Sequence, residues 1–559
     1  MNISEERFKK TIAVLIAVVT TLIAIVTYLQ SDAGARDDAA NRDTKRYSLE
    51  SFGRQVSGDA RVNFDYNSAY QAYYELDLLA VSAANAGDEA AANRYAALRD
   101  QMTGLSPLLA PPYFDPQTGE VNVAKYEADT YVVETTALAE RFVAASAVKD
   151  AWDTKANTYI VHLTLLAVAL FLYGLSTTVS GSLTRWVFSG VGTVVALVAT
   201  LWAVAVFLSP VPDLRECKTS DGRYAIDAYA TGVGLAYQGV YEQAAAEFDL
   251  ALACQSSYTN ALNARAESQA ALGNYEAAAA SYEQARAAGD ASASTAGELA
   301  WMYYLLGRFD DATKMNRTAL AADPSLLWAH YDLALSLLAT GKVDEAKAEY
   351  ANGMNAAARQ VADAKAAGQE PSSELWWSLD DAALSLDTLL FTLDTGEGNP
   401  TRDQIVNPDA AGAAVTDLSS QLKSLSVALE YTGQPPTGTL ATAISPFTFA
   451  EPLYDEQGNF TDYAVADTFE YGASAVAVLF DYDHMQDGQD VVFKVYVDGE
   501  EDPSWRLIDK WVLGTSGGAE KPLSFDYSYA NVLRPGFYTV EMYVDSHLGQ
   551  SGSFVIGEP

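Results

Sequence analysis

Cysteine and histidine are scarce in this chain. Its 559 residues include two cysteines, Cys217 and Cys254, and four histidines. Two thiols are too few for a thiolate metal cluster or a disulfide scaffold, and the scattered histidines have no metal-ligand spacing. The two cysteines form either one disulfide or two unpaired thiols, and unpaired thiols are the commoner arrangement. We therefore expect neither a metal nor a cofactor.

Basic residues are also few, with 35 Lys and Arg against 73 Asp and Glu, and the formal net charge is -38. Such a chain repels phosphate backbones, which argues against nucleic-acid binding. The sequence contains no phosphate loop, no dinucleotide-binding glycine motif and no zinc-binding helix. These absences remove several enzyme classes.

Two segments resemble functional motifs only in part. Residues 514–518 match the G-x-S-x-G pattern of serine hydrolases, but a predicted strand follows where that motif needs a helix. We predict a glycine-rich turn there. Residues 481–490 collect four aspartates, yet Met485 falls where an EF-hand loop needs an oxygen ligand. We predict an acidic turn between strands, and we find no catalytic residues, so the protein is predicted not to be an enzyme.

Charge is missing from three long apolar stretches, residues 11–29, 159–178 and 187–208. About 20 apolar residues suffice to cross the hydrocarbon core as a helix. We predict a transmembrane anchor in residues 1–30 and two transmembrane helices in residues 158–209. His162 lies near the start of the second stretch, from which its imidazole is expected to reach the interface.

The first stretch is either a cleaved signal peptide or an uncleaved anchor, and its length favours the anchor. Basic residues before it place the amino terminus in the cytoplasm, and Arg185 in the turn between the other two stretches agrees. Basic residues on the opposite side argue for the reverse orientation: Arg36, Arg42, Lys45, Arg46, Lys149, Lys155, Arg215 and Lys218. We predict a multi-pass cell-membrane protein whose soluble domains are extracytoplasmic.

Residues 31–157 are predicted to form a helical lobe. An apolar periodicity runs through residues 43–102, a proline-rich break follows at 106–119, and helix resumes over 121–153 directly into the second apolar stretch. This layout of one span, a helical lobe and a closing pair of spans resembles a family of uncharacterised bacterial membrane proteins. The resemblance implies no activity.

A repeat of 34 residues occupies the middle of the chain. Its markers are glycines, alanines five positions later and small residues seven positions earlier. The glycines are Gly239, Gly273, Gly307 and Gly341; the alanines are Ala244, Ala278, Ala312 and Ala346; the small residues are Gly232, Ala266, Ala300 and Ala334.

These positions resemble the tetratricopeptide repeat (TPR) family, and they assign four repeats to residues 217–358. The resemblance implies pairs of antiparallel helices in which the glycine ends the first helix and the small residues lie at the helix crossing. One pair cannot bury its own apolar face, so the pairs are expected to stack into an α-solenoid that holds a protein or peptide.

The family's groove positions, transferred to this sequence, give nine candidate peptide-binding residues. They are Tyr229, Val233, Tyr237, Asn263, Trp301, Tyr304, Trp328, Tyr331 and Leu335. This set lacks the basic residues of a carboxylate clamp, and its aromatic rings suit an apolar or proline-containing peptide, or a helix. Alternatively, some of these rings pack between repeats or against the chain's own helices.

After the repeats, residues 359–430 are predicted to be capping helices, at 372–393 and 413–429, and residues 431–446 a linker. Residues 447–559 alternate polar and apolar side chains and predict an all-β sandwich. Its predicted strands are 476–480, 491–497, 505–513, 523–527, 537–545 and 553–556. The sequences GFYTVEMYVD and LGQSGSFVIG resemble the last hairpin of immunoglobulin-like modules found on bacterial surface and membrane proteins.

The predicted function is that of a non-enzymatic, membrane-anchored TPR scaffold for protein–protein interaction. Its expected partners are a protein or peptide in the groove and the lipid bilayer, and the helical lobe suggests a homo-oligomer. The alternative is a cell-envelope protein that binds glycans through aromatic side chains of the C-terminal β-sandwich.

Overall fold

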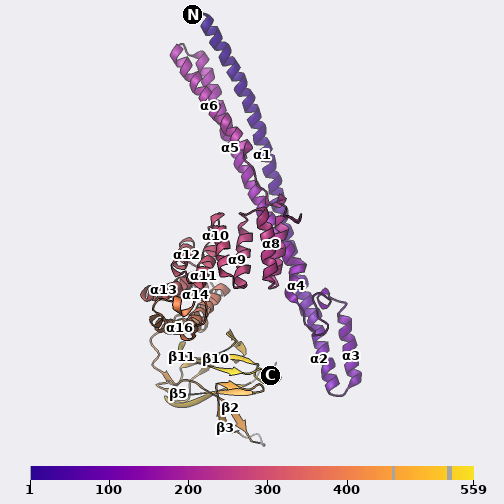
Figure 1. The fold of residues 1–559 in the computed structure, drawn as a ribbon, viewed down its shortest axis with the longest axis vertical. Helices are drawn as coiled ribbons and strands as arrows, with labels where there is room; N and C mark the ends of the chain where they lie inside the picture. Colours follow the sequence, from indigo (N-terminus) through magenta and orange to yellow (C-terminus); the bar gives the residue numbers. More distant parts are fainter. Residues whose placement is uncertain (1, 456–459, 525–531, 559) are drawn as a thin grey trace. The chain divides into compact units, whose positions relative to one another are not determined.

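The computed structural model describes residues 2–455, 460–524 and 532–558. The chain divides into two compact units, Met1–Gly289 and Asp290–Pro559. The first contains the long helices and the first two helix pairs of the repeat, and the second contains the next two pairs, two further helices and the β-strands (Figure 1).

Three helices of the first unit carry the three uncharged stretches, and each is long and apolar enough to cross a membrane. They are α1 (Asn2–Phe64), α5 (Val133–Thr178) and α6 (Ser182–Leu208). With 63 residues, α1 is about 95 Å long. Helix α1 continues past its apolar stretch without a break, and α5 runs into its apolar stretch without a break, as the sequence predicts.

A seven-residue spacing of buried side chains holds these helices together. On α1 the buried positions are Ile12, Val19, Val26, Ala33 and Ala40. On α5 two such series interleave, and their members are Tyr159, His162, Leu166, Ala169, Tyr173 and Ser176. This spacing keeps one seam of each helix against its partner, as in a left-handed coiled coil.

Small residues form the buried face of α6, where it packs against α5. They are Ser189, Gly192, Ala196, Ala199 and Ala203. A methyl group added to Gly192 would lie 3.2 Å from the carbonyl oxygen of Ala169. His162 is fully buried in this bundle, with its ring edge-on to Trp202 at 4.6 Å. The expectation that His162 reaches the interface is therefore wrong, because the neighbouring helices enclose it.

The helical lobe contains more breaks than the sequence predicts. Its elements are η1 (Asp65–Tyr70), α2 (Gln71–Asn85), α3 (Glu89–Met102), η2 (Pro107–Leu109), α4 (Val123–Glu127) and η3 (Ala128–Val132). Helix does not run unbroken from residue 43 to 102: the chain reverses between α2 and α3. Gly87 has a φ of 78°, and the Asp88 side chain caps α3 by accepting a hydrogen bond from the amide of Ala91. These two residues end one helix and start the next.

Four antiparallel helix pairs follow the 34-residue register. The pairs are α7 (Ala225–Tyr237) with α8 (Tyr241–Cys254), α9 (Thr259–Ala271) with α10 (Tyr275–Ala287), α11 (Ala293–Leu305) with α12 (Phe309–Ala322), and α13 (Leu327–Ala339) with α14 (Val343–Ala366).

The repeated glycines end the first helix of each pair, as predicted. All four have φ between 73° and 75°, and in the first pair the amide of Val240 donates to the carbonyl of Leu235 at 2.9 Å. This backbone bond closes a Schellman motif. At the crossing, a methyl group added to Gly232 would lie 2.5 Å from the ring of Phe248. The small residues thus let the two helices approach closely.

In the second unit, α15 (Ser373–Thr395) packs against α13 and α16 (Pro408–Tyr431) packs against α14. The 3-10 turn η5 (Arg402–Gln404) joins the two helices. Both helices thus pack on the helix pair of the last repeat. A second 3-10 turn, η4 (Leu214–Glu216), precedes the first repeat in the other unit.

Two sheets complete the second unit. One has the order β1-β5-β2-β3 with β9 on β5, and the other has the order β4-β11-β10-β6-β7 with β8 on β6. The strands are β1 (Ala443–Ile444), β2 (Thr448–Tyr454), β3 (Phe460–Val465), β4 (Thr468–Phe469), β5 (Ala475–Asp483), β6 (Asp490–Val497), β7 (Glu500–Glu501), β8 (Leu507–Lys510), β9 (Ser516–Ser524), β10 (Gly536–Val544) and β11 (His547–Ile556), and η6 (Pro503–Trp505) lies before β8. Both sheets contribute to one apolar core, for example Val478 from the first and Val540 from the second.

The strand predictions need two corrections. Residues 516–518 belong to β9 rather than to a glycine-rich turn, because β9 pairs with β5 along its whole length, from Ser516 opposite Asp483 to Ser524 opposite Ala475. The sequence pattern also missed β2 and β3, which are mostly exposed and carry little alternation. The predicted strand at 523–527 extends past Ser524 into residues outside those described.

Candidate functional site

The predicted groove of the first repeat is covered by the chain itself. Helix α7 packs against α5, and Ile226 and Ala230 share a buried cluster with Ala137 and Ala144. A methyl group added to Gly234 would lie 2.4 Å from a methyl carbon of Val133. The inner helix of this repeat therefore already has a helical partner from the lobe.

Polar contacts reinforce this packing. Buried Glu140 of α5 accepts hydrogen bonds from the Tyr258 hydroxyl at 2.8 Å and the Asn260 amide at 2.7 Å. Burial raises the pKa of the Glu140 carboxyl, and the two donors oppose that rise. Arg141 of the same helix pairs with Asp227 at 2.6 Å. Polar side chains of α5 thus form hydrogen bonds or ion pairs with residues of both the first and the second repeat.

Four of the nine predicted groove residues lie in this unit. Tyr229 packs between Phe248 and Tyr258, with ring centroids 5.7 and 5.1 Å away. Tyr237 donates a hydrogen bond to Glu127, and this bond raises the pKa of Tyr237 to about 12. Val233 and Asn263 are half-buried. The two tyrosines thus contact the chain's own residues, which is the alternative that the sequence leaves open.

The second unit contains an open pocket of about 600 Å³, here named the tryptophan pocket. Helices α11, α13 and α15 and the turn before α13 form its walls. The lining residues are Ala293, Ser294, Gly297, Glu298, Trp301, Asp323, Leu326, Trp328, Asp332, Glu374, Trp377 and Asp381. Predicted residues Trp301 and Trp328 meet here, together with Trp377, which the family's groove positions do not include.

A glycine allows two of these elements to meet. The six-membered ring of Trp328 lies over Gly297 of α11, where an added methyl group would come within 2.1 Å of two ring carbons. Trp301 stacks on Tyr304 with a centroid distance of 5.2 Å and an interplanar angle of 14°. The two indoles are therefore held in place by packing, whereas Trp377 is 58% exposed at the rim.

The other predicted residues of this unit are buried and do not line the pocket. Tyr304, Tyr331 and Leu335 are 4%, 2% and 1% exposed. Tyr331 packs on Tyr350, and Gly353 provides the space for its ring. Buried rings of this kind support a wall rather than line an open surface, and their contact with a peptide stays a prediction.

The pocket is acidic. Its lining includes five carboxylates and, among the residues described, no basic side chain: Glu298, Asp323, Asp332, Glu374 and Asp381. Burial, with the charges of Asp381 and Glu298 adding to it, raises the pKa of Asp332 well above its usual range, and burial also raises the pKa of Asp381. The repeat pattern does not indicate Trp377 or these carboxyl groups. The WWSLDD run of α15 is the sequence signal that contains Trp377 and Asp381.

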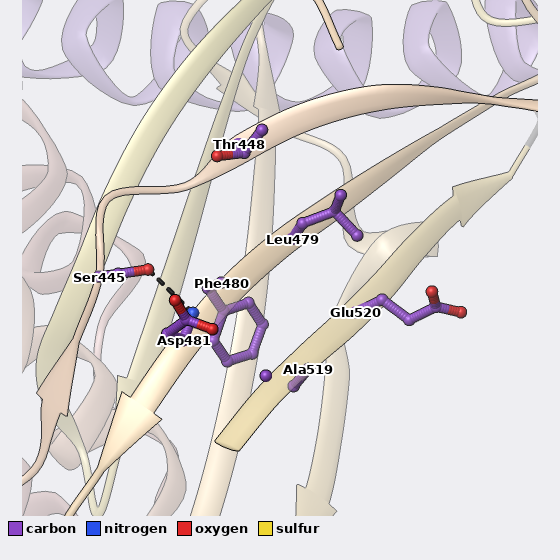
Figure 2. Close-up of a pocket in the computed structure, with 8 residues that line it drawn as sticks. Ser445, Thr448, Leu479, Phe480, Asp481, Ala519 and Glu520 are labelled. Atoms are coloured by element: carbon purple, nitrogen blue, oxygen red, sulfur yellow. Dashed lines mark hydrogen bonds between the residues drawn. The ribbon is translucent and has the colours of Figure 1, made fainter. Parts of the chain in front are cut away.

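The β-region has a second, shallower hollow of about 440 Å³ on its first sheet (Figure 2). Its floor is formed by β5 and β9, and the Ser445 hydroxyl accepts a hydrogen bond from the amide of Asp481 at 2.9 Å. Most large aromatic rings of this region belong to the shared core. Tyr454 and Phe460, at facing positions of β2 and β3, are the most exposed rings described, at 61% and 51%.

The acidic segment between β5 and β6 is used internally. Asp483 accepts a hydrogen bond from the Ser516 hydroxyl, Asp487 accepts one from the amide of Gly514, and Asp490 pairs with Lys510. Among the residues described, no group of three His, Cys, Asp or Glu side chains is arranged to hold a metal ion.

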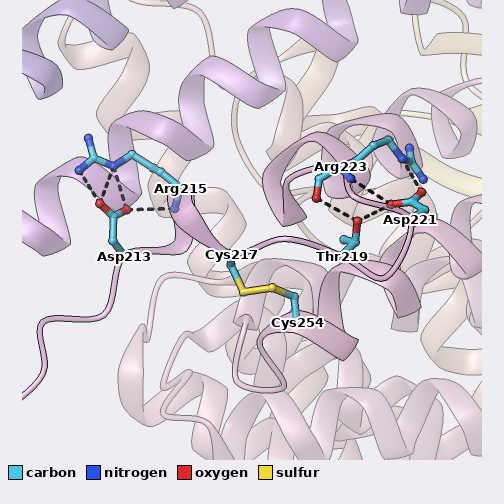
Figure 3. The surroundings of a disulfide bond; sticks show 7 residues. All are labelled: Asp213, Arg215, Cys217, Thr219, Asp221, Arg223 and Cys254. Atoms are coloured by element: carbon cyan, nitrogen blue, oxygen red, sulfur yellow. Dashed lines mark hydrogen bonds and ion pairs between the residues drawn. A yellow bond between two sulfur atoms is a disulfide. The ribbon is translucent and has the colours of Figure 1, made fainter.

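Cys217 and Cys254 form a disulfide, with Cα atoms 6.1 Å apart (Figure 3). The commoner arrangement of two unpaired thiols is thus not the one found. The bond ties the segment after α6 to the end of α8. Arg215 beside it pairs with Asp213 at 2.7 Å and with Asp43 of α1 at 3.0 Å, so the same segment is also anchored to the long helix.

No protein-family model and no curated protein matches this chain. Among solved structures, the chain is similar to YrrB, described as a TPR protein with an unusual peptide-binding site, at 20% identity over 29% of this chain and 86% of that one, with a TM-score of 0.23. It is also similar to MamA, at 14% identity over 34% of this chain and 93% of that one, with a TM-score of 0.23. A MamA fragment from Desulfovibrio magneticus RS-1 matches at 18% identity over 34% of this chain and 96% of that one, with a TM-score of 0.24.

Proposed function

We propose that this chain is a membrane-anchored, non-enzymatic scaffold that holds a partner protein in the tryptophan pocket. The observation that carries the proposal is the meeting of Trp301, Trp328 and Trp377 around an open space of about 600 Å³. Helix pairs of this type present concave surfaces for other proteins, and aromatic anchors dominate such interfaces. The groove of the first repeat is occupied by α5, which leaves the pocket of the second unit for a partner.

Photo-crosslinking in cells tests this function. A photoreactive phenylalanine analogue replaces Trp377 at the pocket rim, and the matched control carries it at Phe391 of the same helix, which is similarly exposed at 55% but does not line the pocket. A discrete crosslinked partner from position 377 is expected, and Trp328→Ala should abolish it. Identical products from both positions, or none from 377, would count against the scaffold.

The membrane anchor belongs to the same proposal. The seven-residue seam of α1, α5 and α6 and the length of their apolar stretches support a three-helix anchor. The disulfide supports an extracytoplasmic location for the soluble parts, because disulfides persist in oxidising compartments. Protease added to intact spheroplasts should therefore degrade the β-region, whereas protection until the membrane is broken would reverse the orientation.

Glycan binding by the immunoglobulin-like β-sandwich is the second candidate. The exposed pair Tyr454 and Phe460, on neighbouring strands, favours it, whereas most of the other rings described in this region are in the core. Stacking on a sugar needs an exposed aromatic face. A glycan array probed with the full chain and with Tyr454→Ala would show a signal that depends on this residue, and an array without signal would remove the candidate.

A further inference from the structure

The tryptophan pocket combines aromatic surface with acidic side chains. Three indoles and five carboxyl groups share the wall, and no lysine, arginine or histidine lines it among the residues that the structure describes. An indole face attracts a cation through its quadrupole, and a carboxylate attracts it through its charge. Both kinds of wall residue therefore favour the same class of ligand.

Two of these carboxyl groups have no partner within the part of the chain that the structure describes. Asp332 of α13 and Asp381 of α15 are half-buried, and neither side chain has a hydrogen bond or ion pair among the residues described. Elsewhere in the same unit, comparable acids are paired: Asp387 and Glu541 both contact Lys423 at 2.8 Å. A half-buried carboxylate without a donor is costly, and a bound cation would offset that cost.

Other ligands fit less well. A peptide carboxyl terminus or a phosphate would face an acidic wall that has no basic side chain among the residues described. A bare metal ion needs three or more ligands around one point, and among the residues described no such group exists. An uncharged apolar peptide would bury Asp332 and Asp381 without a partner. A cation on a flexible apolar stem satisfies both the rings and the carboxylates.

We propose that the tryptophan pocket binds the cationic head of an arginine or lysine side chain presented by the partner protein. The stem lies along Trp301 and Trp328, and the head lies between Asp332 and Asp381. This inference rests on the proposed scaffold function and specifies what the pocket recognises. The negative net charge of the chain attracts cations at long range but does not select a binding site. The three tryptophans give the pocket the local specificity that net charge lacks.

Saturation-transfer NMR on the full chain in nanodiscs of zwitterionic lipid tests the inference. The probe is the pentapeptide acetyl-Gly-Gly-Arg-Gly-Gly-amide, and its matched control carries neutral citrulline in place of arginine. We expect saturation to concentrate on the arginine methylenes and the citrulline peptide to bind about tenfold more weakly, a difference typical of a partly desolvated cation–π site. Equal binding of the two peptides would overturn the inference.

Protein variants separate the pocket from the general acidity of the surface. Asp332→Asn with Asp381→Asn should reduce binding of the arginine peptide about tenfold. The control pair Asp310→Asn with Asp311→Asn removes the same charge from α12, outside the pocket, and should leave binding within about twofold. Equal losses in both pairs would mean that the peptide binds only through net charge.

Further results distinguish the proposed recognition of a cationic side chain from the proposed scaffold function. Tetramethylammonium that saturates the pocket at a lower concentration than the arginine peptide would reassign the site to a free small cation. A crosslinked partner at position 377, together with equal binding of the arginine and citrulline peptides, would support the scaffold function and overturn the proposal that the pocket binds a cationic side chain. Specific binding of the arginine peptide without any crosslinked partner would support the pocket chemistry and count against the scaffold.

Discussion

At the scale of single residues, Gly297 determines whether the tryptophan pocket exists. It lies in the middle of α11, where glycine is ordinarily unfavourable, and the ring of Trp328 occupies the space that a side chain would fill. Glycine at this position lowers the intrinsic stability of the helix. It also allows the indole of Trp328, from the next repeat, to pack directly on the backbone of α11.

The variant Gly297→Ala should therefore destabilise the second unit by about 1 to 3 kcal/mol, because the methyl group would displace Trp328. The matched variant Gly412→Ala on α16 meets only ordinary contact, at 3.7 Å from Leu393, and should stabilise by about 0.5 to 1 kcal/mol. Denaturant unfolding of the full chain, followed by tryptophan fluorescence, measures both. The same sign for the two variants would contradict this account.

The carboxyl groups of the tryptophan pocket should make the affinity for a cation depend on pH. Burial and neighbouring carboxylates raise the pKa of Asp332, and burial raises that of Asp381, so the empty pocket retains protons at pH values where an ordinary aspartate is ionised. A bound cation favours the ionised form, so binding releases protons and weakens as pH falls through the raised values. Glu298, Asp323 and Glu374 face the same space.

Titration of the arginine peptide from about pH 8 to about pH 5 checks this expectation, since a carboxyl of ordinary pKa stays ionised over that range. Affinity should fall steadily in the natural chain. In Asp332→Asn with Asp381→Asn, the affinity should be low throughout and nearly independent of pH. A profile that is flat in both proteins would show that these two carboxyls do not exchange protons on binding.

At the scale of secondary-structure elements, a buried ion network joins α16 to the second sheet. Lys494 of β6 is 6% exposed and contacts Glu430 at 2.9 Å and Glu501 at 3.1 Å, and Arg506 contacts Glu430 at 2.6 Å. Val427 of α16 packs on Val492 and Tyr543 beside it. The second sheet is thus packed directly onto α16.

Removing one member of the network leaves buried charges without partners. Lys494→Met should destabilise the contact between α16 and the sheet by about 3 kcal/mol. Lys510→Met removes an exposed lysine that pairs with Asp490, and should cost less than about 1 kcal/mol. The rate of limited proteolysis within residues 431–446 reports the difference. Equal rates in the two variants would mean that the network does not hold the sheet.

Two glycines of α6 test the packing of the apolar bundle. Gly192 lies against the backbone of α5, whereas nothing lies within 4 Å of a methyl group added to Gly190. Gly192→Leu should separate the helices and lower the melting temperature of the detergent-solubilised chain, because small residues permit the close approach. Gly190→Leu should leave it nearly unchanged. A larger effect at position 190 would contradict the arrangement of these helices.

Some elements of this structure can be predicted from the sequence and others cannot. The 34-residue register correctly predicts four helix pairs and the role of the four glycines, because those features depend on local backbone geometry and on a repeated crossing. It places Trp301 and Trp328 in one site. It does not place Trp377, Asp332 or Asp381 there, because α15 lies outside the repeat and its contact with α13 is tertiary.

The same limit applies to the first groove. Tyr237 occupies one of the family's groove positions, yet its partner Glu127 in α4, and Arg141 of α5, which pairs with Asp227 on the same helix α7, lie more than 80 residues earlier in the chain. Covering contacts between distant segments leave no periodic signal in a single sequence. The hairpin of β2 and β3 was missed for a related reason, since its exposed side chains show no strict alternation.

At the scale of the whole molecule, the disulfide closes a loop of 37 residues that includes the first repeat. Reduction should therefore destabilise the first unit by about 3 to 4 kcal/mol, as expected for a loop of this length. The melting temperature of the full chain with and without dithiothreitol measures the effect. Cys217→Ala with Cys254→Ala should melt at the lower temperature and be insensitive to the reductant, and any remaining sensitivity would contradict the assignment.

The unbroken helix α1 sets a standoff distance. The roughly 35 residues that follow its apolar stretch extend about 50 Å, at 1.5 Å per residue. In the proposed membrane anchor, the hairpin of α2 and α3 is therefore held well outside the ionic atmosphere of the lipid headgroups, which decays over about 8 Å. Only a partner that is soluble, or that projects at least this far from the bilayer, reaches the tip of the hairpin.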